Sequence, residues 1–215
     1  MVSPSIFKQI FSGSYLFHLH TRYTDGNLYP VEYFEFAQQH GYQRLIFLEH
    51  IRRSPNYDIS QYVSEIRECE SRFLVPATIG FEAKVLPGGE LDISDEHLKL
   101  AQVVGIAEHG FKGTLAELCN SLRLVFCRSK ELPCVWVHPG LGLRRKAELE
   151  KQPFTYAGLL EEASALGILI ECNRRYGLIQ EEYISRFVGN IVWGLDAHSQ
   201  SDLSSQLVSC AREGT

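Results

Sequence analysis

The feature of this sequence that most constrains its fold is the regular alternation of short apolar segments with longer amphipathic ones. Such alternation is typical of repeated strand–helix units around a parallel sheet. Seven segments have the length and composition of buried strands: Tyr15–His20, Arg44–His50, Ala77–Glu82, Val103–His109, Cys134–His138, Ile168–Cys172 and Ile191–Asp196. Seven units fit a closed or nearly closed barrel better than an open sheet. We therefore expect an α/β barrel and a single domain over residues 1–215, without an internal boundary.

The amphipathic segments between the strands predict six helices: Pro30–His40, Ile59–Arg72, Thr114–Cys127, Thr155–Leu166, Glu181–Val188 and Leu203–Ala211. Proline suits the first turn of a helix and glycine its C-terminal cap, and Pro30 and Gly41 stand at these places. Residues 84–94 predict a loop or hairpin whose turn is Pro87-Gly88-Gly89. Residues 141–151 are polar and basic, and we expect them to be exposed.

The C-terminal ends of the predicted strands carry most of the histidines of the chain. With the carboxylates beside them, these residues are His18, His20, Asp25, His50, Glu82, His109, His138, Asp196 and His198. In parallel α/β barrels the loops that follow the strands build the active site. Six of the eight histidines and three carboxylates are therefore expected to meet at one mouth.

Imidazoles and carboxylates together suit zinc, manganese or iron. His18 and His20, two apart on a strand, point to the same face. Each residue also has an ordinary interpretation: Asp25-Gly26 is a good turn dipeptide, and Glu82 could be an exposed charge. That all nine are ordinary at once is improbable, and nine ligands exceed the needs of one metal. The pattern therefore indicates several ions, with a carboxylate that bridges two of them.

The motifs that contain these residues resemble those of the polymerase-and-histidinol-phosphatase (PHP) superfamily of metal-dependent phosphoesterases. They are His18-Leu-His20, Tyr23-Thr-Asp-Gly26, Glu49-His50, Gly80-Phe-Glu82, Glu108-His109, His138-Pro139 and Gly194-Leu-Asp196-Ala-His198. The resemblance extends from about Phe17 to Ser199. It implies a distorted (β/α)7 barrel that holds up to three divalent ions of manganese, zinc or iron.

The resemblance also implies a ligand set for each ion. The sets are His18, His20, Glu82 and Asp196 for the first ion, Glu82, His109 and His138 for the second, and Asp25, His50 and His198 for the third. Glu82 would bridge two ions, and we expect catalytic roles for Glu82, His109 and Asp196. The spacing of 27 residues from Glu82 to His109 is similar to that of the compact histidinol-phosphatase and nucleic-acid-associated branches. Glu49 departs from the family, which usually has aspartate there, and its extra methylene bears on the support of the third ion.

A phosphate substrate also needs positive groups outside the metal shell. Arg144 and Arg145 follow the fifth predicted strand, and Arg174 and Arg175 follow the sixth, on the side of the mouth. Arginine is better suited than lysine to a bidentate contact with phosphate. We expect at least one of the four to bind phosphate. The alternative for each is an ordinary solvated charge.

Composition restricts the remaining classes of function. The net charge of −5 argues against a general nucleic-acid binder, although bound metals would concentrate positive charge in one cleft. Residues 1–13 show no secretory signal, and no apolar run approaches the ~20 residues of a membrane helix. The six cysteines are far apart and include no CxxC pair, which indicates reduced, buried thiols. We expect a cytoplasmic protein with no membrane partner.

Three functions fit these observations. The first is a phosphomonoesterase that hydrolyses a small phosphorylated metabolite or nucleotide by metal-activated hydroxide, because divalent ions clamp the anion and lower the pKa of bound water to about 7. The second is a 3′→5′ exonuclease or another phosphodiesterase that acts on nucleic acid. The third is a non-catalytic, metal-stabilised module that serves a partner protein.

Overall fold

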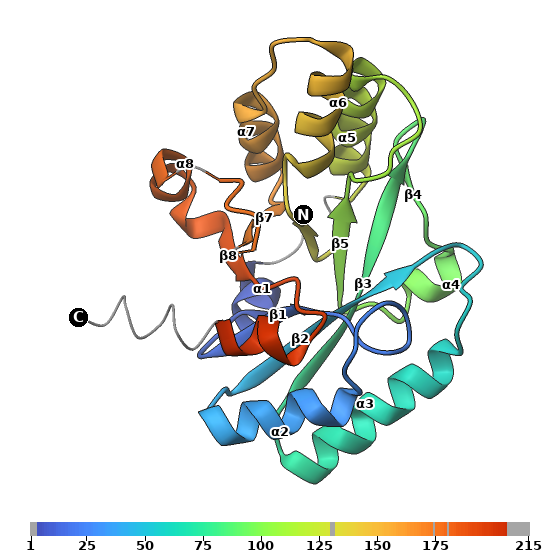
Figure 1. Cartoon of the computed structure of the whole chain (residues 1–215), viewed down its shortest axis with the longest axis vertical. Helices are drawn as coiled ribbons and strands as arrows, with labels where there is room; N and C mark the ends of the chain where they lie inside the picture. The colour runs from blue at the N-terminus through green and yellow to red at the C-terminus, as the bar shows by residue number, and fades with distance from the viewer. Residues whose placement is uncertain (1–3, 130–131, 174, 180, 206–215) are drawn as a thin grey trace.

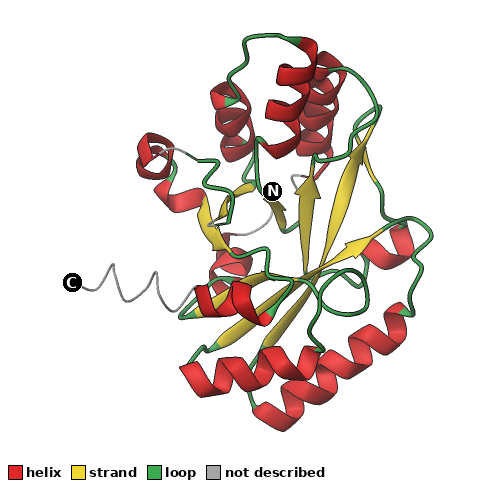
Figure 2. Ribbon diagram, viewed as in Figure 1, coloured by secondary structure: helices red, strands yellow, loops and turns green. Residues whose placement is uncertain are grey.

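The computed structural model describes residues 4–129, 132–173, 175–179 and 181–205. Seven parallel strands form one sheet in chain order (Figures 1 and 2): β1 Tyr15–Leu19, β2 Arg44–Ile51, β3 Ala77–Leu86, β5 Val103–Ala107, β6 Cys134–Trp136, β7 Leu169–Asn173 and β8 Ile191–Gly194. The segment after β8 returns to β1, where Leu19 and Ala197 form a parallel bridge. The Ala197 N–H also donates to the His18 carbonyl at 2.9 Å. The sheet is thus a nearly closed barrel, as predicted.

Helices surround the barrel (Figure 2): α1 Pro4–Ile10, α2 Pro30–His40, α3 Ile59–Phe73, α4 Asp95–Leu98, α5 Leu115–Ser129, α6 Leu141–Glu150, α7 Ala157–Ala165 and α8 Glu181–Arg186, with a short 3-10 helix Val188–Asn190. Helix α2 has the predicted bounds, because Pro30 opens its first turn and Gly41 ends it at a φ of 73°. Of the last predicted helix, residues 203–205 are helical and 206–211 lie outside the described residues.

Two features differ from the sequence-based expectation or refine it. The polar stretch 141–151, which we expected to be exposed, forms helix α6; Arg144 and Arg145 are exposed, but Gly142, Leu143 and Ala147 are buried. The 84–94 segment is a hairpin, in which strand β4 (Glu90–Leu91) pairs antiparallel with the end of β3. Gly88 and Gly89 form its turn with φ values of 86° and 74°, a region that favours glycine.

The buried apolar residues form two clusters, one inside the barrel and one between the strands and the helices. The inner cluster includes Phe17, Ile46, Leu48, Val103, Val135, Val137, Leu169 and Val192. Ile10 at the end of α1 belongs to the same cluster, and the Phe11 ring packs 5.1 Å from that of Phe17. Residues at and after the end of α1 therefore close the barrel at the start of the strands. The other end, where the strands finish, is left for the polar residues.

The cysteines are free thiols among the described residues. Cys69, Cys134 and Cys172 are buried and Cys119 is partly buried, but Cys127 is exposed, so the expectation of buried thiols is wrong at that position. The sixth predicted thiol, Cys210, lies outside the described residues. Within the described part of the chain, no helix combines the length and apolar character that crossing a membrane requires.

Candidate metal centre

Glu82 lies at the centre of a cluster of imidazoles at the C-terminal end of the strands. Its carboxylate is almost fully buried and has five ring nitrogens around it. Oε2 faces His18 Nε2 at 3.3 Å, His20 Nε2 at 3.3 Å and His50 Nδ1 at 3.2 Å. Oε1 faces His138 Nε2 at 3.2 Å and His109 Nδ1 at 3.6 Å. The two oxygens thus face different groups of imidazoles, which is the arrangement that a bridging ligand requires.

Asp196 completes a four-residue group with Glu82, His18 and His20. Its Oδ1 lies 3.2 Å from His20 Nε2 and 3.6 Å from His18 Nε2. Four potential ligand atoms therefore face one small space. These are the residues predicted for the first ion.

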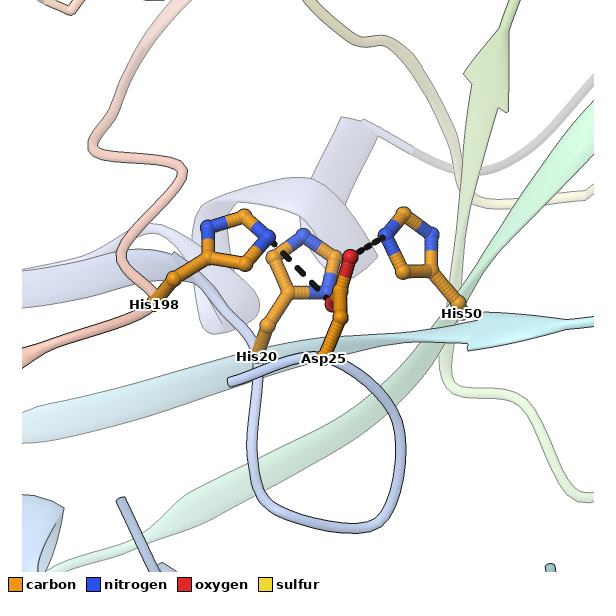
Figure 3. A group of neighbouring side chains, drawn as sticks. All are labelled: His20, Asp25, His50 and His198. Carbon is orange, nitrogen blue, oxygen red and sulfur yellow. Dashed lines mark ion pairs between the residues drawn. The ribbon is translucent and has the colours of Figure 1, made fainter. Parts of the chain in front are cut away.

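Asp25 joins a second group beside the first (Figure 3). Its side chain lies between His50 and His198, with Oδ2 3.2 Å from His50 Nε2 and Oδ1 3.4 Å from His198 Nε2. The His20 ring stacks on those of His50 and His198, at 4.3 and 4.4 Å between centroids. His20 therefore lies between the residues predicted for the first and third ions.

Strained backbone helps to aim these side chains. His18, His138 and Asp196 have φ values of 69°, 32° and 52°, in the left-handed region that non-glycine residues seldom adopt. At His18 the pairing of β1 with β2 also shifts register, so β1 carries a bulge there. The His18 and His20 rings still meet, 4.9 Å apart, but through a bulge and not through the regular two-residue alternation of a strand.

Glu171 on β7 is a functional candidate that the motifs did not include. It is fully buried, and its Oε1 lies 2.7 Å from His18 Nδ1. An ionised carboxylate only accepts, so Nδ1 carries the hydrogen and Nε2 is left free to ligate. Its Oε2 accepts the His138 backbone N–H at 2.5 Å. A charged residue inside an otherwise apolar strand, buried on both faces, was the available signal.

A backbone carbonyl group orients the ring of His198. Its Nδ1 lies 2.9 Å from the carbonyl oxygen of Asp196, which can only accept, so Nε2 is the nitrogen presented to Asp25. Arg175 donates to the same carbonyl at 3.1 Å. The Tyr176 ring packs edge-on against His138 at 6.0 Å. Arg175 and Tyr176 thus border the cluster directly.

Glu49 supports the loop that carries Asp25 and is not itself placed as a ligand. Its buried carboxylate accepts the Thr21 N–H at 2.9 Å and the hydroxyl groups of Thr21 and Thr24. Its Oε1 lies 3.9 Å from His20 Nδ1, beyond hydrogen-bonding distance. The longer side chain therefore holds the turn after β1.

Glu108, which precedes His109, fastens helix α6 to the barrel. Its Oε1 accepts from the N–H groups of Gly142 and Leu143, at 3.1 and 3.3 Å, in the first turn of the helix. Burial raises the pKa of this carboxyl group to about 7, against the lowering effect of these hydrogen bonds. The orphan N–H groups of the helix start are thereby satisfied within the protein.

Burial and neighbouring charged groups shift the pKa values within the cluster. Burial alone would raise the pKa of Glu82, but hydrogen bonds from His138 and His18, together with the nearby imidazole of His20, hold it well below its usual range. Burial alone would lower the pKa of His18, but the charges of Glu171 and Asp196 raise it to about 10. Burial lowers the pKa of His109 to about 4, so this ring is neutral at pH 7 and ready to ligate.

The side chains of the cluster are suited to binding divalent metal ions. The described residues contain three compact sets of potential ligand atoms: His20, Asp25, His50 and His198; His18, Glu82 and His138; and His18, His20 and Asp196. Both ring nitrogens of His20 and Nδ1 of His109 and of His138 are buried without a hydrogen bond. His109 belongs to none of the three sets, although its Nδ1 approaches Glu82. Orphaned imidazole nitrogens that face buried carboxylates are what a metal site presents.

Two cavities open onto the cluster, and both touch Asp25, His50 and His109. The larger, of about 1050 Å³, extends along α6, and the smaller, of about 450 Å³, extends along residues 51–57. Among the predicted arginines, Arg144 and Arg145 line the larger cavity from a helix and not from a loop. Arg144 donates to Tyr156 Oη at 3.2 Å and to the Leu178 carbonyl at 2.9 Å. Arg174 lies outside the described residues.

Comparison with solved structures shows a protein of similar fold. A protein from Listeria monocytogenes, described as a candidate histidinol phosphatase (hisK), superposes with a TM-score of 0.61 over 88% of this chain and 97% of its own. The two share the fold. Their sequences are 14% identical. The alignment with an HpcH/HpaI aldolase from Desulfitobacterium hafniense covers 97% of this chain and 70% of the aldolase at 13% identity. Its TM-score of 0.29 is too low to indicate a shared fold. No protein-family model matches the sequence, and no curated protein matches it.

Proposed function

We propose that the chain is a metal-dependent phosphoesterase of the PHP type, and foremost a phosphomonoesterase that acts on a small phosphorylated substrate. The observation that carries the proposal is Glu82, a buried carboxylate whose two oxygens face separate groups of imidazoles below an open cavity. The shared fold with a candidate histidinol phosphatase supports it.

We assign a set of ligands to each of three ions. The sets are His18, His20, Glu82 and Asp196 for one ion, Glu82, His109 and His138 for a second, and Asp25, His50 and His198 for a third. Bound divalent manganese, zinc or iron would lower the pKa of a water molecule and neutralise the phosphate oxygens. We assign catalytic roles to Glu82, His109 and Asp196 because their side chains would contact these ions.

The residues of the chain orient this chemistry and bind the substrate. Glu171 and the Asp196 carbonyl hold His18 and His198 in the tautomer that leaves Nε2 free. Arg175 reaches the edge of the cluster, and among the three predicted arginines that the structure describes we assign the contact with a phosphate there to it. Its guanidinium cannot ligate a cation, so its role would be confined to the substrate.

A second candidate function is phosphodiester hydrolysis. It is favoured by the two cavities, which meet at Asp25, His50 and His109 and so leave room on both sides of the cluster. A diester carries a group on each side of the phosphorus atom, whereas a monoester carries only one. Nucleic acid therefore stays an alternative substrate.

The test is turnover by protein reconstituted with manganese, zinc or iron. The substrates are p-nitrophenyl phosphate, bis(p-nitrophenyl) phosphate and a single-stranded oligonucleotide, and metal content is measured in parallel by elemental analysis. We expect two to three ions per chain and faster turnover of the monoester. Glu82→Gln should lose metal and activity together, whereas His40→Gln, at the exposed end of α2, should change neither. No turnover of any substrate by metal-loaded protein would refute the proposal.

A further inference from the structure

The larger cavity continues beyond the metal cluster along a wall of cations. This wall, here called the basic wall, consists of Lys112 from the segment after β5 and Arg145 and Lys146 from helix α6. A cavity of about 1050 Å³ exceeds the needs of one phosphate group and is at the upper end of the range for sites of small organic ligands. The part beyond the metal cluster is therefore available to the rest of the substrate.

Contacts made by Lys146 hold the basic wall in place without neutralising its positive charges. Lys146 donates to the Gly113 carbonyl, and its ammonium lies 5.6 Å from the centre of the Phe111 ring. These contacts join α6 to the segment that carries Lys112. Glu108 fastens the first turn of the same helix to the end of β5. Lys112 and Arg145 thus project from two segments that are fixed to each other.

Lys112 and Arg145 have no ion pair or hydrogen bond within the described part of the chain. Elsewhere on the surface, four arginines are paired with exposed or partly exposed carboxylates: Arg53 with Glu90, Arg67 with Glu70, Arg123 with Glu162 and Arg186 with Glu161. Two exposed carboxylates line the same cavity: Asp25, which belongs to the metal cluster, and Glu148, which lies on α6. On the side of the basic wall, cations therefore outnumber anions. Unpaired cations in a concave wall raise the local concentration of anions.

We propose that the basic wall binds a second phosphate group, carried by the leaving group of the phosphoester. The inference rests on the proposed function and specifies the class of its substrate. Gly140, two residues after His138 of the cluster, caps the start of α6, and Arg145 lies five residues further on, roughly 7 Å along a helix axis. The two phosphates would thus be separated by a spacer of several bonds. A small bisphosphorylated molecule meets this requirement, and so does the next phosphate of an oligonucleotide.

Binding is tested first on protein stripped of metal with a chelator, because the cluster then holds no metal ion that could bind a phosphate group. The probes are butanediol bisphosphate, with one phosphate at each end, and butyl phosphate, both titrated by calorimetry. We expect the double variant Lys112→Ala/Arg145→Ala to bind the bisphosphate about tenfold more weakly or worse, since it loses two charge-assisted contacts. The matched control Arg72→Ala/Lys99→Ala, which removes the same two charges outside both cavities, should bind as the wild type does. Equal weakening of both variants would overturn the proposal.

Turnover measurements then show which cavity binds the second phosphate group, and whether this group belongs to a small molecule or to nucleic acid. With metal-loaded wild type, kcat/KM should be about tenfold or more higher for the bisphosphate than for butyl phosphate, and this ratio should approach one in Lys112→Ala/Arg145→Ala. If the ratio instead collapses in Arg52→Ala/Lys84→Ala, whose cations line the smaller cavity, the basic wall is not the site. A single-stranded trinucleotide that shows the larger dependence on Lys112 and Arg145 would identify nucleic acid as the source. No turnover of any ester, with wall-dependent binding intact, would refute the proposed function and not this site.

Discussion

Glu171→Gln is the substitution that best tests how the metal cluster is built. Both carboxylate oxygens of Glu171 accept hydrogens, Oε1 from His18 Nδ1 at 2.7 Å and Oε2 from the His138 backbone N–H at 2.5 Å. A glutamine has one accepting oxygen and one donating NH2 group. In either orientation of the amide, one donor of the protein therefore faces another donor in a fully buried site.

The magnitude follows from these contacts. Loss of a hydrogen bond to a charged group costs about 1.5–3 kcal/mol, and a buried donor left unsatisfied costs about 1–3 kcal/mol more. We expect metal-stripped Glu171→Gln to be less stable than wild type by about 3 kcal/mol or more. For a domain of this size that lowers Tm by roughly 6–12 °C. Metal affinity should fall about 10–100-fold, because His18 loses the partner that orients it.

The effect on stability should also depend on pH, with a defined sign. In the metal-free fold the pKa of His18 is raised to about 10, and the charge of Glu171 is the largest contribution that raises it. A raised pKa stabilises the folded state below the unfolded value of about 6.5, and the contribution is lost as the pH rises toward 10. The gap between wild type and Glu171→Gln should therefore be wide at about pH 6 and narrower at about pH 9.

The assay is urea denaturation of chelator-treated protein at these two pH values, with metal affinity measured by competition against a chromogenic chelator. Glu161→Gln is the control, because Glu161 forms an exposed ion pair with Arg186 that is worth about 1 kcal/mol or less. The reasoning fails if Glu171→Gln is no more destabilising than Glu161→Gln. It also fails if the gap to wild type widens as the pH rises.

Three further outcomes are expected. In metal-free wild type, the Glu108 carboxyl group makes a contribution to stability that falls by about 3 kcal/mol as the pH rises from about 4.5 to about 7, because burial raises its pKa to about 7 in the fold. Glu108→Gln should remove this contribution, and the same slope of stability against pH in urea titrations of both proteins would contradict it. Arg175→Ala should lower kcat/KM for p-nitrophenyl phosphate about 10–100-fold with metal content unchanged, and wild-type kinetics would exclude the contact. Gly194→Ala should weaken metal binding as much as Glu171→Gln does, because its Cβ would lie 1.7 Å from Glu171 Oε1 and would displace that carboxylate. Wild-type affinity in the chelator competition would show that the cluster tolerates the displacement.

Local patterns were enough to predict the barrel and the residues at its mouth. Apolar strands end in polar residues where the chain leaves the core, and parallel topology brings all of these ends to one side. That is why Glu82, His138 and Asp196 could be named before any contact was known. Helix α2 was predicted with its bounds because Pro30 and Gly41 act on their own backbone, independently of the rest of the fold.

The contacts of helix α6 and of Glu171 were not predicted because they depend on distant segments. The first turn of α6 is satisfied by Glu108 on another unit of the barrel, and no local signal marks that contact. Glu171 meets His18, 153 residues away, and only closure of the barrel brings the two together. The sequence by itself determined which chemical groups gather at the mouth, because strand ends are local features. Only the tertiary structure decided which carboxylate orients which imidazole. It also decided that Arg144 donates to Tyr156 whereas Arg145 lines the cavity without an ion pair. Both outcomes depend on packing between separate strand–helix units.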